Sequence, residues 1–270
     1  MGINKNLYRK DVYRNRRGLI IWSIILIGIT LMVLAIFPIM ANFQDEMMTM
    51  MEGFSSEMND SMGYSAEMWS SILNFYSTYY GVYIVMLMSI FSTTTATNII
   101  AKEERNQTSE FLYTKPIARK EVFWSKFMVL LTVLGIVFVI QTAIAFGGIQ
   151  LFKTGPIDVG AFFIMNVHGL ILAFFFTCVG LFASVYMRPK KNFMGVVLGL
   201  IFGMFFLDAI SKVADSINWL GYISPFHYMG FGVMQSDFTF NTIPAIVLLA
   251  LAGTLVFLSL QKFKKKDILG

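Results

Sequence analysis

Six long windows without a charged residue divide this chain, and short polar or charged segments connect them. The windows cover residues 18–44, 68–101, 127–152, 159–187, 192–207 and 238–261. A helix rises about 1.5 Å per residue and the hydrocarbon layer of a bilayer is about 30 Å thick, so about 20 apolar residues span it. The pattern therefore predicts an all-α polytopic membrane protein with six transmembrane helices, the fifth being the shortest.

Basic residues concentrate on alternate connections between these windows. Of the 21 lysines and arginines, 19 lie in the segments 1–17, 102–126, 188–191 and 262–266. The intervening connections hold ten of the 16 carboxylates but only two lysines. Because short cytoplasmic loops are enriched in Lys and Arg, both ends of the chain are expected on the cytoplasmic side.

The predicted division of the single domain 1–270 follows from this pattern. It comprises a basic interfacial helix (1–17), a first span (18–41), an outer acidic Met-rich segment (42–72), a second span (73–101), a cytoplasmic segment (102–123), a third span (124–152), a fourth (159–187), a fifth (192–211), an outer loop (212–241), a sixth span (242–261) and a basic tail (262–270). A cleaved signal peptide is the alternative for the N-terminus, but the apolar stretch is about twice the usual length.

Composition excludes several other classes. The chain is 56% hydrophobic and 14% charged with a mean hydropathy of +0.66, which is too apolar for an ordinary soluble domain. Its pI near 9.2 suggests nucleic acid binding, but the basic clusters lie beside predicted spans, where anionic lipid is the expected counter-charge. The one cysteine, Cys178, excludes an intramolecular disulfide and is expected to be a packing residue.

The outer segment 42–72 combines acids with apolar residues at helical spacing. The apolar members are Phe43, Met47, Met51, Phe54, Met58 and Met62. This stripe is expected to pack on the outer ends of the spans or on the membrane surface. The alternative is a Met-rich surface that accommodates varied apolar, cationic partners.

Polar residues gather in the inner half of the second span. They are Ser89, Ser92, Thr93, Thr94, Thr95, Thr97 and Asn98. Two interpretations stay open. Their side chains bond to carbonyls one turn back or to a neighbouring helix, or they line a wet passage.

Small residues recur every three or four positions in two later spans. Asn166, Leu170, Ala173, Thr177, Gly180 and Ser184 share one face of the fourth span, and Gly195, Gly199 and Gly203 share one face of the fifth. Such patterns let helix backbones approach closely, either inside one protomer or against a second copy.

The outer loop after the fifth span has two features. Asp208 and Lys212 stand four apart, which favours a helical ion pair. Residues 219–234 are apolar but broken by glycines and Pro225, which predicts a hairpin that dips into the outer leaflet rather than a seventh span.

Motifs for enzymatic chemistry are missing. No glycine precedes a lysine, so no P-loop is present for ATP hydrolysis. His168 and His227 lie in different segments and are expected to be hydrogen-bonded residues, so no metal site is predicted. Glu103 and Glu104 resemble the paired glutamates of membrane-embedded prenyl-protein endopeptidases, but Thr108 stands where that family has an arginine.

The segment between the second and third spans is the most informative. Charges of both signs interleave with apolar side chains, and Pro116 is expected to separate two short helices. A compact helix of this kind suits docking into a cleft on a cytoplasmic protein, whereas a solvated loop is the alternative.

Here the sequence resembles the membrane subunits of type-2 ATP-binding-cassette (ABC-2, type V exporter-like) exporters whose permease and ATPase are separate chains. The matching positions are Glu103 or Glu104, Thr108, Glu110, Leu112, Pro116, Ile117, Arg119 and Lys126. Gln107 stands where that family often has glycine. The run 224–228 also looks like the family's outer re-entrant hairpin.

The resemblance implies roles for several groups of residues. The N-terminal helix would be an elbow, and the segment after the second span would be a coupling helix seated on the ATPase. Coupling residues would be Glu103, Glu104, Thr108, Glu110, Phe111, Leu112, Pro116 and Arg119. The path between two permease copies would be lined or gated by Ser92, Thr93, Thr95, Asn98, Asn166, His168 and Asp208.

By this resemblance the chain is the permease of an ATP-driven exporter in a bacterial plasma membrane, paired as a homodimer or related heterodimer and not itself an enzyme. Two copies of a cytoplasmic ATPase would bind ATP and Mg, and this chain would bind no cofactor. An amphipathic, cationic peptide such as a toxin or bacteriocin is the expected cargo. The alternatives are a small hydrophobic drug or ion as cargo, or a secondary transporter driven by an ion gradient.

Overall fold

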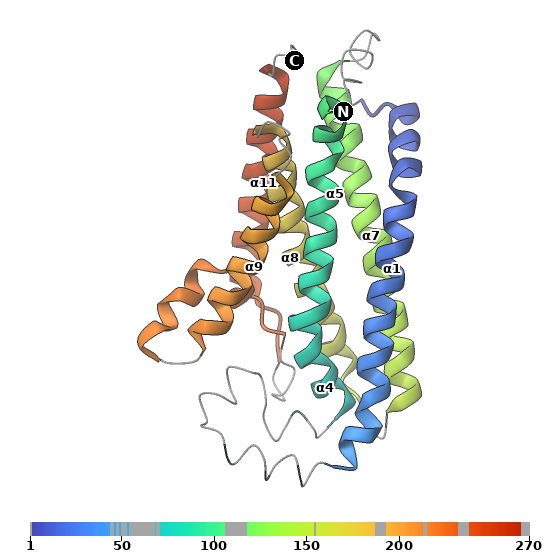
Figure 1. Ribbon diagram of the computed structural model, residues 1–270, viewed down its shortest axis with the longest axis vertical. Helices are drawn as coiled ribbons and strands as arrows, with labels where there is room; N and C mark the ends of the chain where they lie inside the picture. The colour runs from blue at the N-terminus through green and yellow to red at the C-terminus, as the bar shows by residue number, and fades with distance from the viewer. Residues whose placement is uncertain are drawn as a thin grey trace.

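A computed structural model gives the architecture of the chain. It describes residues 2–43, 71–105, 118–153, 155–186, 193–212, 215–231 and 238–265, with the single positions 46, 49, 53 and 68. Within these residues the chain is helical, and no strand occurs. The helices form one elongated bundle with the N- and C-termini at the same end (Figure 1).

Helix α1 (Lys5–Ala41) is followed by a nearly continuous helical rod made of α4 (Ile72–Tyr79), the π-helical turn η2 (Tyr80–Val85) and α5 (Met86–Arg105). Two long helices come next, α7 (Arg119–Phe152) and α8 (Val159–Tyr186). The chain then forms α9 (Phe193–Ser211), the short helices η3 (Asp215–Ile223) and α10 (Pro225–Tyr228), and finally α11 (Thr242–Lys265).

Five helical segments are long and apolar enough to cross a membrane, namely α1, the rod that ends in α5, α7, α8 and α11. Helix α9 is a shorter apolar helix of 19 residues. At about 1.5 Å per residue it extends about 28 Å, just short of the hydrocarbon thickness. By length, five of the six expected spans are thus present among the described residues. Whether α9 also crosses the membrane stays a prediction.

The expected interfacial helix over 1–17 is not a separate element, which corrects the division drawn from sequence. Residues Lys5–Ala41 form one helix of 37 residues, because no proline lies near Arg17 and Gly18 alone does not end the helix. The polar first part of α1 also packs against the bundle, with Leu7 and Asp11 buried. The change from charged to apolar residues marks a change of surroundings, not a helix end.

Three helix pairs have the most extensive packing. Helix α5 packs most extensively on α8, α1 packs on α7, and α11 covers another side of α8. Gly180 of α8 faces the α5 backbone so closely that a methyl group there would lie 2.6 Å from the carbonyl oxygen of Thr93. The small-residue face of the fourth span therefore serves packing within the protomer.

The outer hairpin consists of η3 and α10. Figure 1 shows it leaving the C-terminal end of α9 sideways, level with the middle of the bundle rather than with its far end. Ser224 accepts a hydrogen bond from the backbone N–H of Phe226 and so caps α10, with Pro225 at its first turn. Trp219, Tyr222 and Ile223 are exposed on the hairpin.

Candidate functional site

Four charged side chains meet at the end of the bundle where both termini lie. The Lys126 ammonium on α7 lies 2.8 Å from Oε1 of Glu103 on α5 and 3.4 Å from Oδ2 of Asp11 on α1. It also donates to the carbonyl of Ile99 at 2.8 Å. Arg14 of α1 lies 3.2 Å from Asp11 and 3.7 Å from Glu103. We call these four residues, Asp11, Arg14, Glu103 and Lys126, the ionic cluster.

The ionic cluster is buried, and its charges balance. Side-chain exposure is 0% for Asp11, 1% for Lys126 and 8% for Glu103, while Arg14 keeps 25%. Buried charges are stable only when they are paired, and here the two acids are balanced by two bases, with Lys126 hydrogen-bonded to Asp11 and to the carbonyl of Ile99. The cluster therefore locks α1, α5 and α7 together at one end of the bundle.

Sequence reasoning missed most of the ionic cluster. Arg14 belongs to the predicted basic interfacial helix and Lys126 to the family pattern, whereas Asp11 was not singled out. The one available signal was an acid, Asp11, inside a segment that holds six of the basic residues. Asp11 and Arg14 lie about a hundred positions from Glu103 and Lys126, which are themselves 23 positions apart, so no local spacing pattern reveals the whole cluster.

The predicted coupling residues fall into three groups. Glu103 faces into the bundle as a cluster member, whereas the prediction placed it against an ATPase. Glu104 is part of helix α5, and Arg119 begins α7. Outside the described residues lie Thr108, Glu110, Phe111, Leu112, Pro116 and Ile117. Their role in coupling stays a prediction.

Arg119 connects the start of α7 to the end of α11. Its guanidinium donates a hydrogen bond to the backbone carbonyl of Lys264 at 2.9 Å. The last carbonyls of a helix have no partner within the helix, so a cation at this place satisfies one of them and interacts favourably with the helix dipole. Both ends of the segment 106–117 are thus held to the bundle, one through Glu103 and the other through Arg119.

We expect Arg119→Gln to destabilise the end of α11 by about 1 kcal/mol, because a charge-assisted hydrogen bond at a helix end is lost. Hydrogen exchange of the amides in 262–265 should become about fivefold faster. Lys120→Gln, at the exposed neighbouring position, is the matched control and should leave these amides unchanged. Equal exchange in both variants would show that Arg119 does not hold this helix end.

The polar side chains of the second span lie on two different faces of α5. Ser92 donates to the carbonyls of Ser89 and, across the helix interface, of Ala173 on α8, and Thr93 also bonds to Ser89. Ser92 and Thr93 are buried in this interface. These two residues thus serve helix packing, as the first of the two interpretations proposed.

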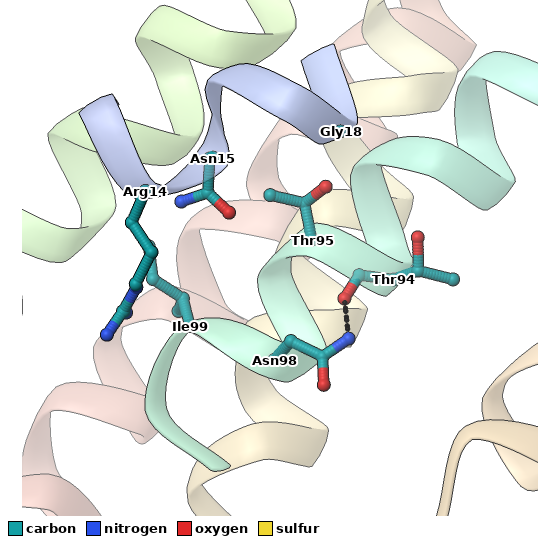
Figure 2. Close-up of a pocket in the computed structure, with 7 residues that line it drawn as sticks. All are labelled: Arg14, Asn15, Gly18, Thr94, Thr95, Asn98 and Ile99. Atoms are coloured by element: carbon teal, nitrogen blue, oxygen red, sulfur yellow. Dashed lines mark hydrogen bonds between the residues drawn. The ribbon is translucent and has the colours of Figure 1, made fainter. Parts of the chain in front are cut away.

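The second face of α5 borders a pocket. Thr94, Thr95, Asn98 and Ile99 lie across from Arg14, Asn15 and Gly18 of α1, and together they line a cavity of about 320 Å³ (Figure 2). On α5, the side chains of Thr94, Thr95 and Asn98 are half-buried there, and Ile99 is buried. We call this cavity the α1–α5 pocket. It joins Thr95 and Asn98 of the predicted path residues and separates them from Ser92 and Thr93.

Asn166 and His168 lie elsewhere, on α8. Asn166 is buried and accepts a hydrogen bond from Thr142 of α7 at 3.2 Å. His168 accepts from the backbone N–H of Asn241 at Nε2, so its other nitrogen, Nδ1, carries the hydrogen that bonds to the carbonyl of Gly230. Asn166 therefore links α8 to α7, and His168 links α8 to the segments that contain Gly230 and Asn241. Neither residue borders the α1–α5 pocket.

Asp208 forms the helical ion pair that its spacing predicts. Its Oδ2 lies 2.9 Å from the ammonium of Lys212. Its Oδ1 lies 3.3 Å from Nδ1 of His227, which the sequence did not place near any carboxylate. A methyl group at Gly221 would lie 2.6 Å from both His227 Nδ1 and Ser211 Oγ. This contact therefore seats the outer hairpin on the end of α9.

The glycines of the fifth span behave differently from Gly180. A methyl group at Gly195, Gly199 or Gly203 would meet nothing within 4 Å. These glycines are thus not used for close helix packing with the described residues of the same protomer. Their role against a second copy stays a prediction.

Comparison with known proteins gives the family. A family model described as ABC-2 family transporter protein matches residues 5–268, nearly the whole chain. No curated protein matches the chain. The expected resemblance is confirmed by this match, which includes α1, the segment 106–117 and the outer hairpin. With its apolar helices, the chain is a multi-pass membrane protein that belongs to the ABC-2 family of transporter proteins.

Proposed function

We propose that the chain is the permease of an ATP-driven exporter and that two copies work with two separate ATPase chains. The family match over residues 5–268 is the observation that carries this proposal. Permeases of this family are membrane components of transporters and are not generally catalytic themselves. ATP hydrolysis then belongs to the partner, in keeping with the missing P-loop.

The proposed topology has six spans with both termini in the cytoplasm of a bacterial cell. Helix α9 supplies the fifth span, and η3 with α10 supplies a re-entrant hairpin. The location of both termini at one end of the bundle supports this topology, as does the distribution of Lys and Arg (Figure 1).

The bundle supplies a route for coupling to an ATPase. A displacement of the segment 106–117 is passed to α5 through Arg105 and to α7 through Ala118, because these residues flank it directly. The ionic cluster carries the motion on to α1, and the bond from Arg119 carries it to α11. Rigid elements joined in this way convert closure of a partner domain into helix movement.

The proposed cargo is an amphipathic, cationic peptide. The support is the acidic composition of 42–72 together with its methionines, whose flexible side chains adapt to varied apolar surfaces. Two measurements distinguish such a peptide from an ion or a small hydrophobic drug, namely transport into vesicles and stimulation of ATP turnover. The proposal expects cationic peptides to be transported and to stimulate ATP turnover, and small ions to do neither.

The partner interface is tested by charge reversal in the predicted coupling helix. Glu110→Lys should lower recovery of a co-expressed stand-alone cassette ATPase by about tenfold or more, because a like charge or an unpaired charge at an interface costs several kcal/mol. Glu46→Lys, in the outer segment, is the matched control and should leave recovery intact. Full recovery and full cargo-stimulated ATP turnover in Glu110→Lys would contradict the assignment of the coupling helix.

A further inference from the structure

The α1–α5 pocket has defined walls along the helix axes. Towards the middle of the bundle, the rings of Trp22 on α1 and Phe91 on α5 lie 5.7 Å apart and close the space between the two helices. Towards the end of the bundle, the ionic cluster joins the same helices through Arg14 and Glu103. The pocket is therefore a window between two apposed helices, open at its side and bounded at both ends.

Apart from Arg14, the pocket side chains offer more unused acceptors than donors, since each of the two amides keeps one N–H. Thr94 and Thr95 donate their hydroxyl hydrogens to the carbonyl of Phe91, at 2.9 Å and 2.8 Å. Asn98 spends one N–H on the carbonyl of Thr94, and Asn15 spends one on that of Asp11. The two hydroxyl oxygens and the two amide oxygens keep lone pairs that these bonds do not use. A ligand with several N–H donors can form hydrogen bonds to these unused oxygen lone pairs.

Arg14, in contrast, presents hydrogen-bond donors and a positive charge to the pocket. Its guanidinium has five N–H donors, and the carboxylates of Asp11 and Glu103 hold it from the side of the ionic cluster. Its side chain remains 25% exposed and lines the pocket, where it suits an anionic oxygen. The pocket therefore fits one ligand that carries both a hydrogen-bond-donating cation and an anion.

The position of the pocket along α1, between basic and apolar surface residues, indicates the source of that ligand. On α1 the exposed Arg16 and Arg17 directly precede Gly18, a pocket residue, and exposed isoleucines follow. These isoleucines are Ile20, Ile21, Ile24 and Ile25. Basic side chains beside an apolar helix surface mark the headgroup level of a bilayer. A lipid seated here would place its acyl chains along the exposed isoleucines.

We propose that the α1–α5 pocket binds the headgroup of an inner-leaflet phospholipid that carries a primary ammonium, such as phosphatidylethanolamine. The ammonium donates to the oxygens of Thr94, Thr95 and Asn98, and the phosphate accepts from Arg14. The cavity of about 320 Å³ has the size of a small-ligand site. Phosphatidylcholine, whose choline nitrogen has no N–H, satisfies only half of the site.

This inference rests on the proposed orientation only for the choice of leaflet. A lipid bound between α1 and α5 couples the membrane to the ionic cluster, because Arg14 belongs to both the pocket and the cluster. Occupancy of the pocket would then hold the cytoplasmic ends of α1 and α5 at a fixed separation. The site itself requires neither an ATPase nor a cargo.

The test uses the full chain purified alone, in nanodiscs of equal parts phosphatidylethanolamine, phosphatidylcholine and phosphatidylglycerol, with retained lipid identified by native mass spectrometry. The wild-type chain should retain phosphatidylethanolamine over phosphatidylcholine by about tenfold, the factor set by the lost hydrogen bonds. Thr95→Val with Asn98→Leu keeps the shape of the pocket, removes two acceptors and should abolish this preference. Thr254→Val is the matched control, because Thr254 lies on α11 and bonds to the carbonyl one turn back.

Three results would overturn the proposal. One is equal retention of the two lipids by the wild-type chain, and another is a double variant that keeps the full preference with unchanged thermal unfolding. The third is a preference for phosphatidylglycerol that Thr95→Val with Asn98→Leu leaves intact, since this points to the charge of Arg14 alone. Failure of ATPase coupling would leave this measurement unaffected.

Discussion

Lys126→Met is expected to lower the free energy of unfolding by about 3–5 kcal/mol, because removing one member of a buried ion pair leaves its partners uncompensated. Methionine fills nearly the same volume, so the loss is electrostatic rather than steric. Arg14 would then be the remaining cation of the ionic cluster for the two carboxylates of Asp11 and Glu103. The carbonyl of Ile99 would lose the bond from the ammonium as well.

Chemical denaturation in detergent micelles, followed by tryptophan fluorescence, measures this change. Lys120→Met is the matched control, since Lys120 is exposed on the same helix and its replacement should cost less than about 1 kcal/mol. Adding Glu103→Gln to Lys126→Met should restore at least about 1 kcal/mol, because the two residues interact directly. Stability of Lys126→Met within 1 kcal/mol of the wild-type chain would contradict the ionic cluster.

Gly180→Ala should destabilise the packing of α5 on α8 by about 1–3 kcal/mol, since overfilling a well-packed interface forces backbone shifts. The added methyl would lie 2.6 Å from a backbone oxygen of Thr93 and 3.1 Å from the methyl of Ala96. Neither atom belongs to a flexible side chain that can turn away. The helices must therefore move apart, and the expected loss outweighs the gain of about 1 kcal/mol in helix propensity.

Gly253→Ala provides the control with the opposite sign. Gly253 lies on an exposed face of α11, and a methyl group there meets nothing within 4 Å. Its replacement should be neutral or stabilise the chain by up to about 1 kcal/mol, because alanine restricts the unfolded chain. Thermal unfolding of both variants in the same detergent measures the difference. A Gly180→Ala chain that melts at or above the wild-type temperature would contradict the claim that α8 packs on the α5 backbone at Gly180.

Sequence predicted the positions of the long helices well because bilayer thickness imposes the length of an apolar window. The ends of the first and fourth apolar windows, for example, correspond closely to the ends of α1 and α8 at Ala41 and Tyr186. The separate interfacial helix was wrong, since hydropathy reports the surroundings of a residue and not whether the helix continues through Arg17.

The candidate site was less accessible from sequence. Ser92 and Thr95 have the same chemistry and lie three positions apart, yet one faces α8 and the other faces α1. Which face is buried depends on neighbours that are distant in the chain. The same reason hides the pairing of Asp208 with His227, and of Lys126 with Asp11.

Transport by purified components tests the central proposal most directly. Proteoliposomes would contain the chain either alone or together with its cassette ATPase, and uptake of a labelled cationic peptide would be followed. The account predicts uphill transport only when the ATPase, ATP and Mg are present, and none from a sodium or proton gradient alone. Gradient-driven uphill transport by the chain without any ATPase would contradict it.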